Sequence, residues 1–390
     1  MSSVVPGDPV RIAIIPDSFK GTLPARDVAR AIAQGVARAA SDAGRDVTIT
    51  QLPFADGGEG TLEATLAAWQ TEARICEATD AIGRDITAGF AVSPDGRIAL
   101  IEAAQANGLA AVSDVPLRAR EATTGGVGRV VRAALECGVE EVILTIGGSA
   151  TTDGGTGLMR ELGARFLDGD GAELPDGGGA LIDLAEIDLT GVDPRLHDVR
   201  WRIATDVTNP LTGPHGAAHV FGPQKGASPD DVEHLDRCLA RVAEVVRRSG
   251  GRELEGLAGL GAAGGLAAIL YAFFDAELVP GWELVAGALG AREIIGAADI
   301  VITGEGRFDT QSLDGKVIYG VRQMTRPGVP LVVIAGNVSL DAETLARSGV
   351  TAAFSICRGP ATLAEIAPDT AEHLEWTACQ IARLLLRPST

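Results

Sequence analysis

Residues 10–36 read VRIAIIPDSFKGTLPARDVARAIAQGV, and this stretch decides the fold class. Its first residues, 10–15, form an apolar run rich in β-branched side chains, which is typical of a buried strand. From Ala25 onward apolar residues such as Val28 and Ile32 recur at helical spacing. A polar loop, PDSFKGT, joins the two segments. The stretch therefore predicts a strand-loop-helix unit with polar side chains at the end of its strand.

The same unit recurs along the chain. A helical pattern near residues 127–134 ends at Gly138, a strand is expected at 142–146, and a glycine-rich loop then leads into another helix. Further strand-like runs lie at residues 47–50, 98–102, 202–205, 300–303 and 331–335. Alternating strands and helices predict an α/β fold with mainly parallel sheets flanked by helices. In such sheets ligands bind beyond the carboxyl ends of the strands, where these polar loops fall.

Length, charge and cysteine content restrict the class of protein. A chain of 390 residues is long enough for two or three domains, and its net charge of −19 argues against nucleic acid or membrane surfaces as partners. No apolar run approaches the roughly 18 residues that span a bilayer, and no secretory signal is visible. The five cysteines are widely spaced and never form a CxxC pair. They predict reduced thiols in a cytoplasmic protein.

Lysine is rare in this chain. Only three of the 33 basic residues are lysines, Lys20, Lys225 and Lys316, and each has a glycine beside it. Lysine is a compact, mobile point charge suited to a phosphate oxygen. We therefore treat these three lysines as candidate site residues, with chance surface placement as the alternative.

The run GGSATTDGGTG at residues 147–157 is a candidate phosphate-binding loop, because glycines let backbone N–H groups approach an anion closely. Asp153 suits a hydrated magnesium ion. The alternative is a structural loop that needs glycine for its backbone angles. The candidate phosphate ligands of this loop are Gly147, Gly148, Ser149, Thr151, Gly154 and Gly155.

Two further loops carry clustered polar groups after predicted strands. In PDSFKG, Asp17, Ser18 and Lys20 follow the first strand, and helix capping explains Ser18 but not Lys20. In VITGEGRFDTQSLDGKV, residues 301–317, the dense mixed charge suits an anionic substrate with a metal-bound nucleotide. The residues concerned are Glu305, Arg307, Asp309, Gln311 and Lys316. The segment ADGGEG, with Asp56 and Glu59, is a similar but weaker signal.

The segment 204–227 adds Asp206 and Asn209, which could share a metal ion or orient a hydroxyl, and Lys225 in a glycine-bounded loop. An Asx-turn before Pro210 explains Asn209 equally well. His215 and His219 have the spacing of a zinc pair, but the glutamate of HExxH and a third ligand are missing.

Several nucleotide-binding signatures are absent from the sequence. It has no GxxxxGK[ST] loop and no protein-kinase HRD or DFG motif. The one GxGxxG, at Gly259, follows no predicted strand, which argues against a nicotinamide-dependent hydroxyacid dehydrogenase. A second alternative is a non-catalytic protein that binds small organic acids. Such a protein would need only one or two cations.

The assembled motifs resemble the bacterial type I glycerate kinase family, also called glycerate 2-kinases. The likeness runs from about Ile12 to Leu385 in the family's order, and it is carried by PDSFKG, PFADGGEGT, TTGGVG, IGGSATTDGGTG, DVTNPLTG, FGPQKGA, GAAGGL and ITGEGRFDTQS. The resemblance implies two α/β domains with the active site in the cleft between them. Residues 1–75 plus 290–390 would form a discontinuous Rossmann/flavodoxin-like domain, and residues 76–289 an inserted one.

The resemblance implies ATP-dependent phosphorylation of D-glycerate to 2-phosphoglycerate with Mg²⁺, and a homodimer is left open. The 3-phosphoglycerate product and a related hydroxy acid substrate are the alternatives. On this hypothesis Lys20 stabilises the transferring group, and Asp206 binds magnesium or accepts the hydroxyl proton. Asp153, Asp206 and Glu305 are candidate magnesium ligands. The 147–157 loop and Lys225 would bind ATP phosphates, and Asp17, Ser18, Arg307 and Lys316 the glycerate.

Overall fold

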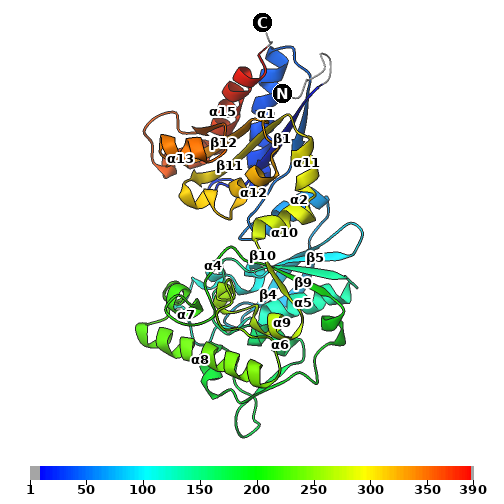
Figure 1. Ribbon diagram of the computed structural model, residues 1–390, viewed down its shortest axis with the longest axis vertical. Helices are drawn as coiled ribbons and strands as arrows, with labels where there is room; N and C mark the ends of the chain where they lie inside the picture. The colour runs from blue at the N-terminus through cyan, green and yellow to red at the C-terminus, as the bar shows by residue number, and fades with distance from the viewer. Residues whose placement is uncertain (1–8, 388–390) are drawn as a thin grey trace. The chain divides into compact units, whose positions relative to one another are not determined.

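The computed structural model describes residues 9–387, which divide into two compact units (Figure 1). Unit 1 comprises the described residues up to Asp56, residues 63–70, and those from Trp282 onward. Unit 2 comprises Gly57–Leu62 and Thr71–Gly281. Apart from the short segment Gly57–Leu62, the chain therefore crosses between units at 70/71 and 281/282, before the 75/76 and 289/290 positions expected from the sequence.

The later crossing falls where it does because helix α10 (Gly281–Ala288) packs within unit 1. The indole N–H of Trp69 donates to the carbonyl of Ala288 at 2.9 Å. Val285 and Leu289 are buried in the same apolar cluster as Ile15 of the first strand. Residues 282–289 therefore share a core with the N-terminal segment.

Unit 1 is built on a five-stranded sheet in the order β13-β12-β11-β1-β2, and all its neighbouring strands are parallel. The strands are β1 (Val10–Pro16), β2 (Val47–Gln51), β11 (Ile300–Phe308), β12 (Leu331–Val338) and β13 (Ala352–Ser355). The helices are α1 (Ala25–Asp42), α2 (Thr61–Trp69), α10, α11 (Ala291–Ala297), α12 (Val317–Met324), α13 (Ala342–Arg347), α14 (Leu363–Ile366) and α15 (Thr370–Leu385). The strand-loop-helix units β1-α1 and β11-α12, which are far apart in sequence, thus contribute neighbouring strands of one sheet.

Alternate residues of β1 face opposite layers of helices. Ile12 and Ile14 are buried in a cluster with residues of α1 and α15, whereas Ala13 and Ile15 are buried with residues of α10, α11 and α12. A strand covered on both faces reads as a continuous apolar run. This is why residues 10–15 show no alternation of polar and apolar side chains.

Unit 2 is built on a six-stranded sheet in the order β10-β9-β6-β5-β4-β3. The strands are β3 (Arg74–Thr79), β4 (Asp85–Val92), β5 (Ile98–Glu102), β6 (Glu141–Thr145), β9 (Arg200–Ala204) and β10 (Glu277–Val279). The pairs of β5, β6, β9 and β10 are parallel, and β3 and β4 extend the sheet as antiparallel strands. The antiparallel hairpin was missed by the sequence analysis, but the prediction of mainly parallel sheets flanked by helices is confirmed.

A large apolar core surrounds this sheet and includes Trp201, Phe166 and Leu144. The helices of unit 2 are α3 (Ala104–Asn107), α4 (Leu109–Val112), α5 (Gly125–Glu136), α6 (Thr156–Glu161), α7 (Ala217–Phe221), α8 (Pro229–Arg248) and α9 (Ala268–Phe273). A two-stranded antiparallel sheet, β7 (Arg165–Leu167) with β8 (Glu186–Asp188), lies apart from the main sheet.

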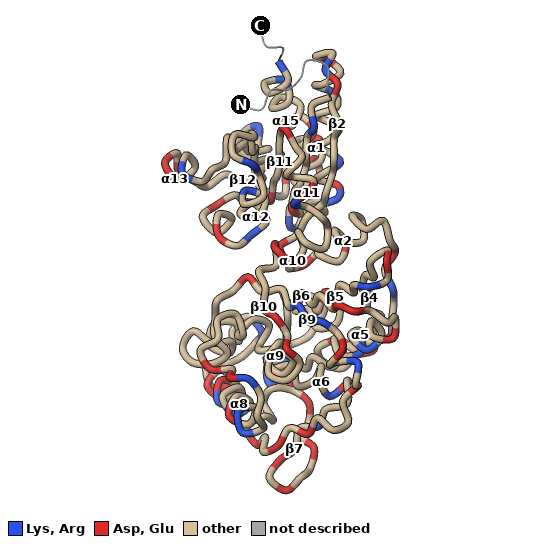
Figure 2. The backbone as a smooth tube through the Cα atoms, turned by 45° about the vertical axis from the view of Figure 1, so that its right-hand side comes forward, with Lys and Arg blue, Asp and Glu red and all other residues tan. Residues whose placement is uncertain are grey.

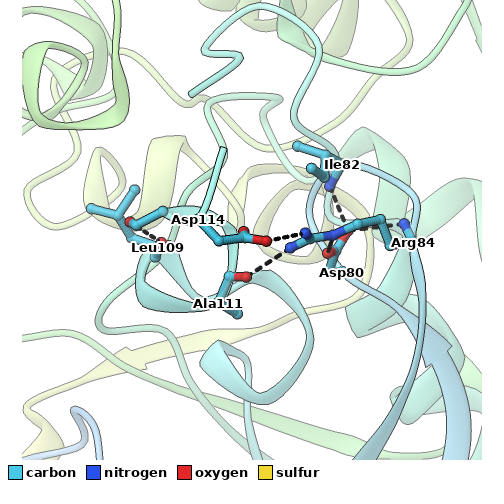
Figure 3. Close-up of polar contacts among 7 residues, drawn as sticks. Asp80, Ile82, Arg84, Leu109, Ala111 and Asp114 are labelled. Atoms are coloured by element: carbon cyan, nitrogen blue, oxygen red, sulfur yellow. Dashed lines mark hydrogen bonds and ion pairs between the residues drawn. The ribbon is translucent and has the colours of Figure 1, made fainter. Parts of the chain in front are cut away.

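An arginine fixes the turn between β3 and β4 (Figure 3). The buried carboxylate of Asp80 accepts hydrogen bonds from the backbone N–H groups of Ile82 and Arg84 and from the Arg84 guanidinium. The same guanidinium donates to Asp114 and to the Ala111 carbonyl, both at 2.7 Å. The hairpin is thereby attached to α4 through one side chain.

Charged residues of both signs are spread over both units (Figure 2). Many arginines form ion pairs within their own unit, such as Arg11 with Asp299 at 2.8 Å and Arg97 with Glu140 at 2.6 Å. Within the described part of the chain, every helix is too short or too polar to cross a lipid bilayer.

Candidate active site

A cavity of about 700 Å³ lies in unit 1 where the strands β1, β11, β12 and β13 reach their carboxyl ends. Its wall contains residues that follow or end each of these strands: Asp17, Ser18, Phe19, Lys20, Glu305, Gly306, Arg307, Gly336, Asn337, Ile356 and Cys357. Parallel strands that lie side by side bring such loops to one edge of the sheet. The cavity therefore assembles side chains that are about 340 residues apart in sequence.

Asp17 is the first residue after β1 and is 7% exposed. Its backbone N–H donates to the Gly304 carbonyl at 2.8 Å, which fixes it beside β11. Its carboxylate accepts a hydrogen bond from the Ser18 amide at 2.6 Å. Burial, together with the negative charges of Asp56 and Glu305, raises the pKa of Asp17 to about 7, against the opposing effects of the Ser18 amide and Lys20.

Glu305 lies within β11 and is also 7% exposed. Burial raises the pKa of this carboxyl to about 7 against the opposing effects of Ser312 and Lys316, and the charges of Asp309 and Asp56 add to the increase. Its Oε1 atom is buried and has no hydrogen-bond partner among the described residues. An unsatisfied buried carboxylate oxygen is costly, so this atom is arranged for a donor or cation that is not part of the chain.

Three cations line the same cavity: Lys20 from the loop after β1, Arg307 from β11, and Lys316 at the start of α12. Lys20 and Arg307 are exposed to solvent. Arg307 forms an ion pair with Asp309, 3.2 Å away. The structure thus brings the predicted residues of PDSFKG together with Glu305, Arg307 and Lys316, and Asp56 lies in the same wall. Glu305 and Arg307 belong to β11, which continues to Phe308, and not to the loop expected there. The predicted residues Asp309 and Gln311 do not line the cavity.

The remaining wall of the cavity is uncharged and was missed by the sequence analysis. It includes Asn337 at the end of β12, Ile356 and Cys357 after β13, Pro360, and Ile366 of α14. Asn337 could have been found, because the strand at 331–335 was expected and the residues just after it are polar. The residues after β13 carried no comparable signal, because the short run AAFS was not recognised as a strand.

The 147–157 loop lies in unit 2 between β6 and α6, and several of its backbone N–H groups are already bonded within the protein. They are those of Ala150 to Asn107, Gly154 to Gly264, and Gly155, Thr156 and Gly157 to Asp153. Gly155 has φ +76°, and a Cβ there would lie 2.1 Å from the Leu266 carbonyl. These observations give Gly154, Gly155 and Gly157 a structural role in the loop.

Lys225 lies under this loop rather than in a solvent-facing site. It is 2% exposed, and its Nζ donates to the Ser149 hydroxyl at 3.1 Å and to the Thr151 carbonyl at 2.6 Å. Burial lowers the pKa of Lys225 to about 7, although the charge of Asp153 opposes this. The lysine, Ser149 and Thr151 therefore satisfy one another inside unit 2.

Asp153 is fully buried, and protein donors occupy its carboxylate. Oδ2 accepts from the amide and hydroxyl of Thr124, both at 2.8 Å, and from the Gly157 amide at 3.3 Å. Oδ1 accepts from the Gly155 amide at 3.1 Å. With its lone pairs used in this way, the carboxylate holds the loop against α5 and is poorly placed to bind a metal ion.

Asp206 follows β9 in unit 2, and its Oδ1 accepts a hydrogen bond from the Gly281 amide at 2.9 Å. Asp206 therefore belongs to a different unit from Lys20. Unit 2 also contains Glu102, a buried acid at the end of β5 that accepts from the amides of Leu62 at 2.9 Å and Gly60 at 3.4 Å. Glu102 was not among the predicted site residues, although an acid that ends the apolar run IALIE is a usable signal.

The carboxylates of the unit 1 cavity fit a magnesium ion, which keeps water and phosphate ligands, better than a metal ion whose ligands all come from the protein. Among residues 9–387 no group of three or more His, Cys, Asp or Glu side chains is arranged to hold a metal ion. Mg²⁺ is usually bound through one or two carboxylates together with water and substrate phosphates. The unpartnered oxygen of Glu305 and the neighbouring Asp17 carboxylate match that pattern.

The protein is thus an α/β protein with a cavity beyond the carboxyl ends of a parallel sheet, which is where proteins of this class bind their ligands. Residues 12–386 match the model of the Glycerate kinase family. The chain belongs to this family, whose characterised relatives are phosphotransferases.

Individual relatives agree with this assignment over nearly their whole length. The chain is 43% identical to the Glycerate 2-kinase of Escherichia coli K12, covering 91% of this chain and 93% of the relative. It is 42% identical to the Glycerate kinase of Bacillus subtilis 168, covering 96% and 97%. A crystal structure described as a glycerate kinase 2 from Salmonella typhimurium LT2 matches with a TM-score of 0.86 and 42% identity, covering 97% of this chain and 98% of that one.

Proposed function

We propose that this chain transfers the γ-phosphoryl group of ATP to the C2 hydroxyl of D-glycerate, giving 2-phosphoglycerate and ADP. The observation that carries the proposal is the meeting of Lys20 and Lys316 with Asp17 and Glu305 in one cavity of a glycerate kinase family member. Phosphoryl transfer requires mainly positioning and neutralisation of charge, and these groups can supply both.

In the proposed reaction the hydroxyl oxygen attacks the γ-phosphorus, and the bond from that phosphorus to the β–γ bridging oxygen breaks. ADP leaves with the electron pair of that bond, and a carboxylate accepts the hydroxyl proton, for which Asp206 stays the candidate. The Nζ of Lys20 stabilises the negative charge of the transferring group. Arg307 and Lys316 bind the glycerate carboxylate, since both are cations of the cavity wall.

Glu305 and Asp17 would hold the magnesium ion, which supplies charge neutralisation at the phosphates when bound. The negative charge of Glu305 contributes to the raised pKa of Asp17, and a bound cation would offset this repulsion. We do not include Asp153 in this metal site, because its oxygens are occupied by protein donors. For the same reason the amides of Ala150 and of residues 154–157, which are bonded within the protein, are not assigned to the ATP phosphates.

Proton-coupled phosphorus NMR of the purified protein with D-glycerate and MgATP tests this proposal. A new phosphomonoester doublet is expected, because one proton couples to phosphorus through the C2 oxygen. A triplet would keep the kinase and change the product to 3-phosphoglycerate. Absence of any new ester would reject D-glycerate phosphorylation, and tight glycerate binding without ATP consumption would favour a binding protein instead.

A homodimer is a separate expectation that the family assignment leaves open. Size-exclusion chromatography with light scattering decides it, since a monomer has a mass of 40.0 kDa. A mass of one chain at working concentrations would reject the dimer without affecting the proposed reaction.

A further inference from the structure

The unit 1 cavity has two chemically different parts. The ends of β1 and β11 contribute Asp17, Lys20, Glu305 and Arg307, whereas the ends of β12 and β13 and the segment that follows contribute uncharged residues. These four strands are neighbours in the order β13-β12-β11-β1. The charged and uncharged parts therefore follow one another along the same sheet edge.

The cavity is much larger than a small hydroxy acid requires. Its volume of about 700 Å³ lies within the range of roughly 300–1,000 Å³ found for sites that enclose drug-sized ligands. Glycerate has carboxylate and hydroxyl groups but no extended apolar face. It would leave the uncharged wall without a partner.

The cavity also lies where the strand order reverses. From β1 the sheet continues to β2 on one side and to β11, β12 and β13 on the other. In open α/β sheets this reversal point creates the crevice in which nucleotides and similar ligands bind. Position, size and mixed chemistry thus favour a ligand with one anionic end and one large, flat, weakly polar end.

We infer that this cavity is the nucleotide site: the adenosine of the phosphoryl donor lies on the uncharged wall, and its phosphates extend toward Lys20. Ile356, Pro360 and Ile366 offer apolar contacts to the base and ribose, and the amide of Asn337 can both donate to and accept from polar atoms of adenosine. The inference rests on the proposed kinase function. It places the donor in unit 1 and not on the glycine-rich loop of unit 2.

Cys357 provides a direct test, because it is an exposed thiol in the wall of this cavity. Cys137, at the end of α5 in unit 2, is also exposed and serves as an internal control. We expect saturating MgADP to slow alkylation of Cys357 by iodoacetamide at least tenfold, measured by mass spectrometry of the peptides. The rate at Cys137 should not change, and D-glycerate alone should leave both rates unchanged.

A pair of glycine substitutions gives an independent test. Gly359 lines the cavity, its backbone lies outside the left-handed region, and a Cβ there meets no atom within 4 Å. Gly359→Trp should therefore fold normally, fill part of the cavity and raise the Kd for MgADP at least tenfold by calorimetry. Gly169→Trp is the matched control, because Gly169 has equally open space but belongs to a surface loop of unit 2.

The outcomes separate this inference from the proposed function. Phosphorylation of glycerate by a protein whose Cys357 is not protected by bound MgADP would overturn the location of the nucleotide and keep the reaction. Protection of Cys357 without phosphoryl transfer would keep the location and reject the reaction. Wild-type affinity of Gly359→Trp for MgADP would also overturn the location.

Discussion

The Nζ of Lys225 lies 3.1 Å from the Oγ of Ser149, and the lysine side chain is almost completely buried. The hydrogen bond joins the glycine-bounded loop of Lys225 to the glycine-rich loop that follows β6. Two of the three N–H donors of this ammonium group are thus bonded within unit 2. Lys225 therefore connects two loops inside unit 2.

Lys225→Met should change how stability depends on pH. Burial lowers the lysine pKa from 10.5 to about 7, so between these pH values the unfolded chain binds more protons than the folded one. The free energy of unfolding of the wild type should therefore gain up to about 1.4 kcal/mol per pH unit from this group as pH rises from 7. Urea unfolding at pH 7, 8 and 9 measures this, and equal slopes for wild type and variant would contradict it.

Asp153→Asn should destabilise the protein without changing its response to magnesium. The amide nitrogen of asparagine would face backbone donors that now bond to a carboxylate, at a cost of about 2–4 kcal/mol. The free energy of unfolding measures the loss. A shifted Mg²⁺ dependence of kcat/KM in this variant would instead support the original assignment of Asp153 as a metal ligand.

Glu305→Gln should stabilise the unliganded protein at alkaline pH and lower its activity. The pKa of Glu305 is raised from 4.5 to about 7, so the folded state binds more protons than the unfolded chain between these values. Wild-type stability should therefore fall as pH rises through this window. At pH 8 the variant should exceed the wild type by about 1–3 kcal/mol, with a smaller difference at pH 5.

Glu343→Gln is the control for this comparison, because Glu343 is an exposed acid of α13 in the same unit. Its stability should follow that of the wild type at both pH values. The interpretation of Glu305 fails if Glu305→Gln shows no gain in stability at pH 8 over pH 5 relative to the wild type.

Lys20→Met should lower kcat by about 10²–10³-fold if its charge stabilises the transferring group. Lys20 is exposed, so the free energy of unfolding should change by less than about 0.5 kcal/mol. Arg26→Met removes an exposed cation from the first turn of α1 and serves as the control, with near-normal turnover expected. Near-normal turnover of Lys20→Met would remove Lys20 from the mechanism.

Part of the site could be predicted because parallel strands obey a simple rule. Each central strand of unit 1 is covered on both faces and therefore reads as an apolar run, and its carboxyl end joins the same edge as its neighbours. Polar residues near the carboxyl ends of such runs were identified from sequence alone. They are Asp17 and Lys20 in the loop after β1, and Glu305 near the end of β11. The fold class followed from the same alternation of strands and helices.

The tertiary structure alone decided which polar residues face a cavity. The loops at 17–20 and 147–157 look equally suited to an anion in sequence, yet the second is bonded internally to Asn107, Gly264 and Lys225. Burial and hydrogen-bond satisfaction depend on contacts between segments far apart in the chain, which residue spacing does not encode. The sequence therefore determined most of the parallel strands, the polar residues near their carboxyl ends and the family. Packing determined that Lys225 and Asp153 support the fold and that Asp17 and Glu305 line the cavity.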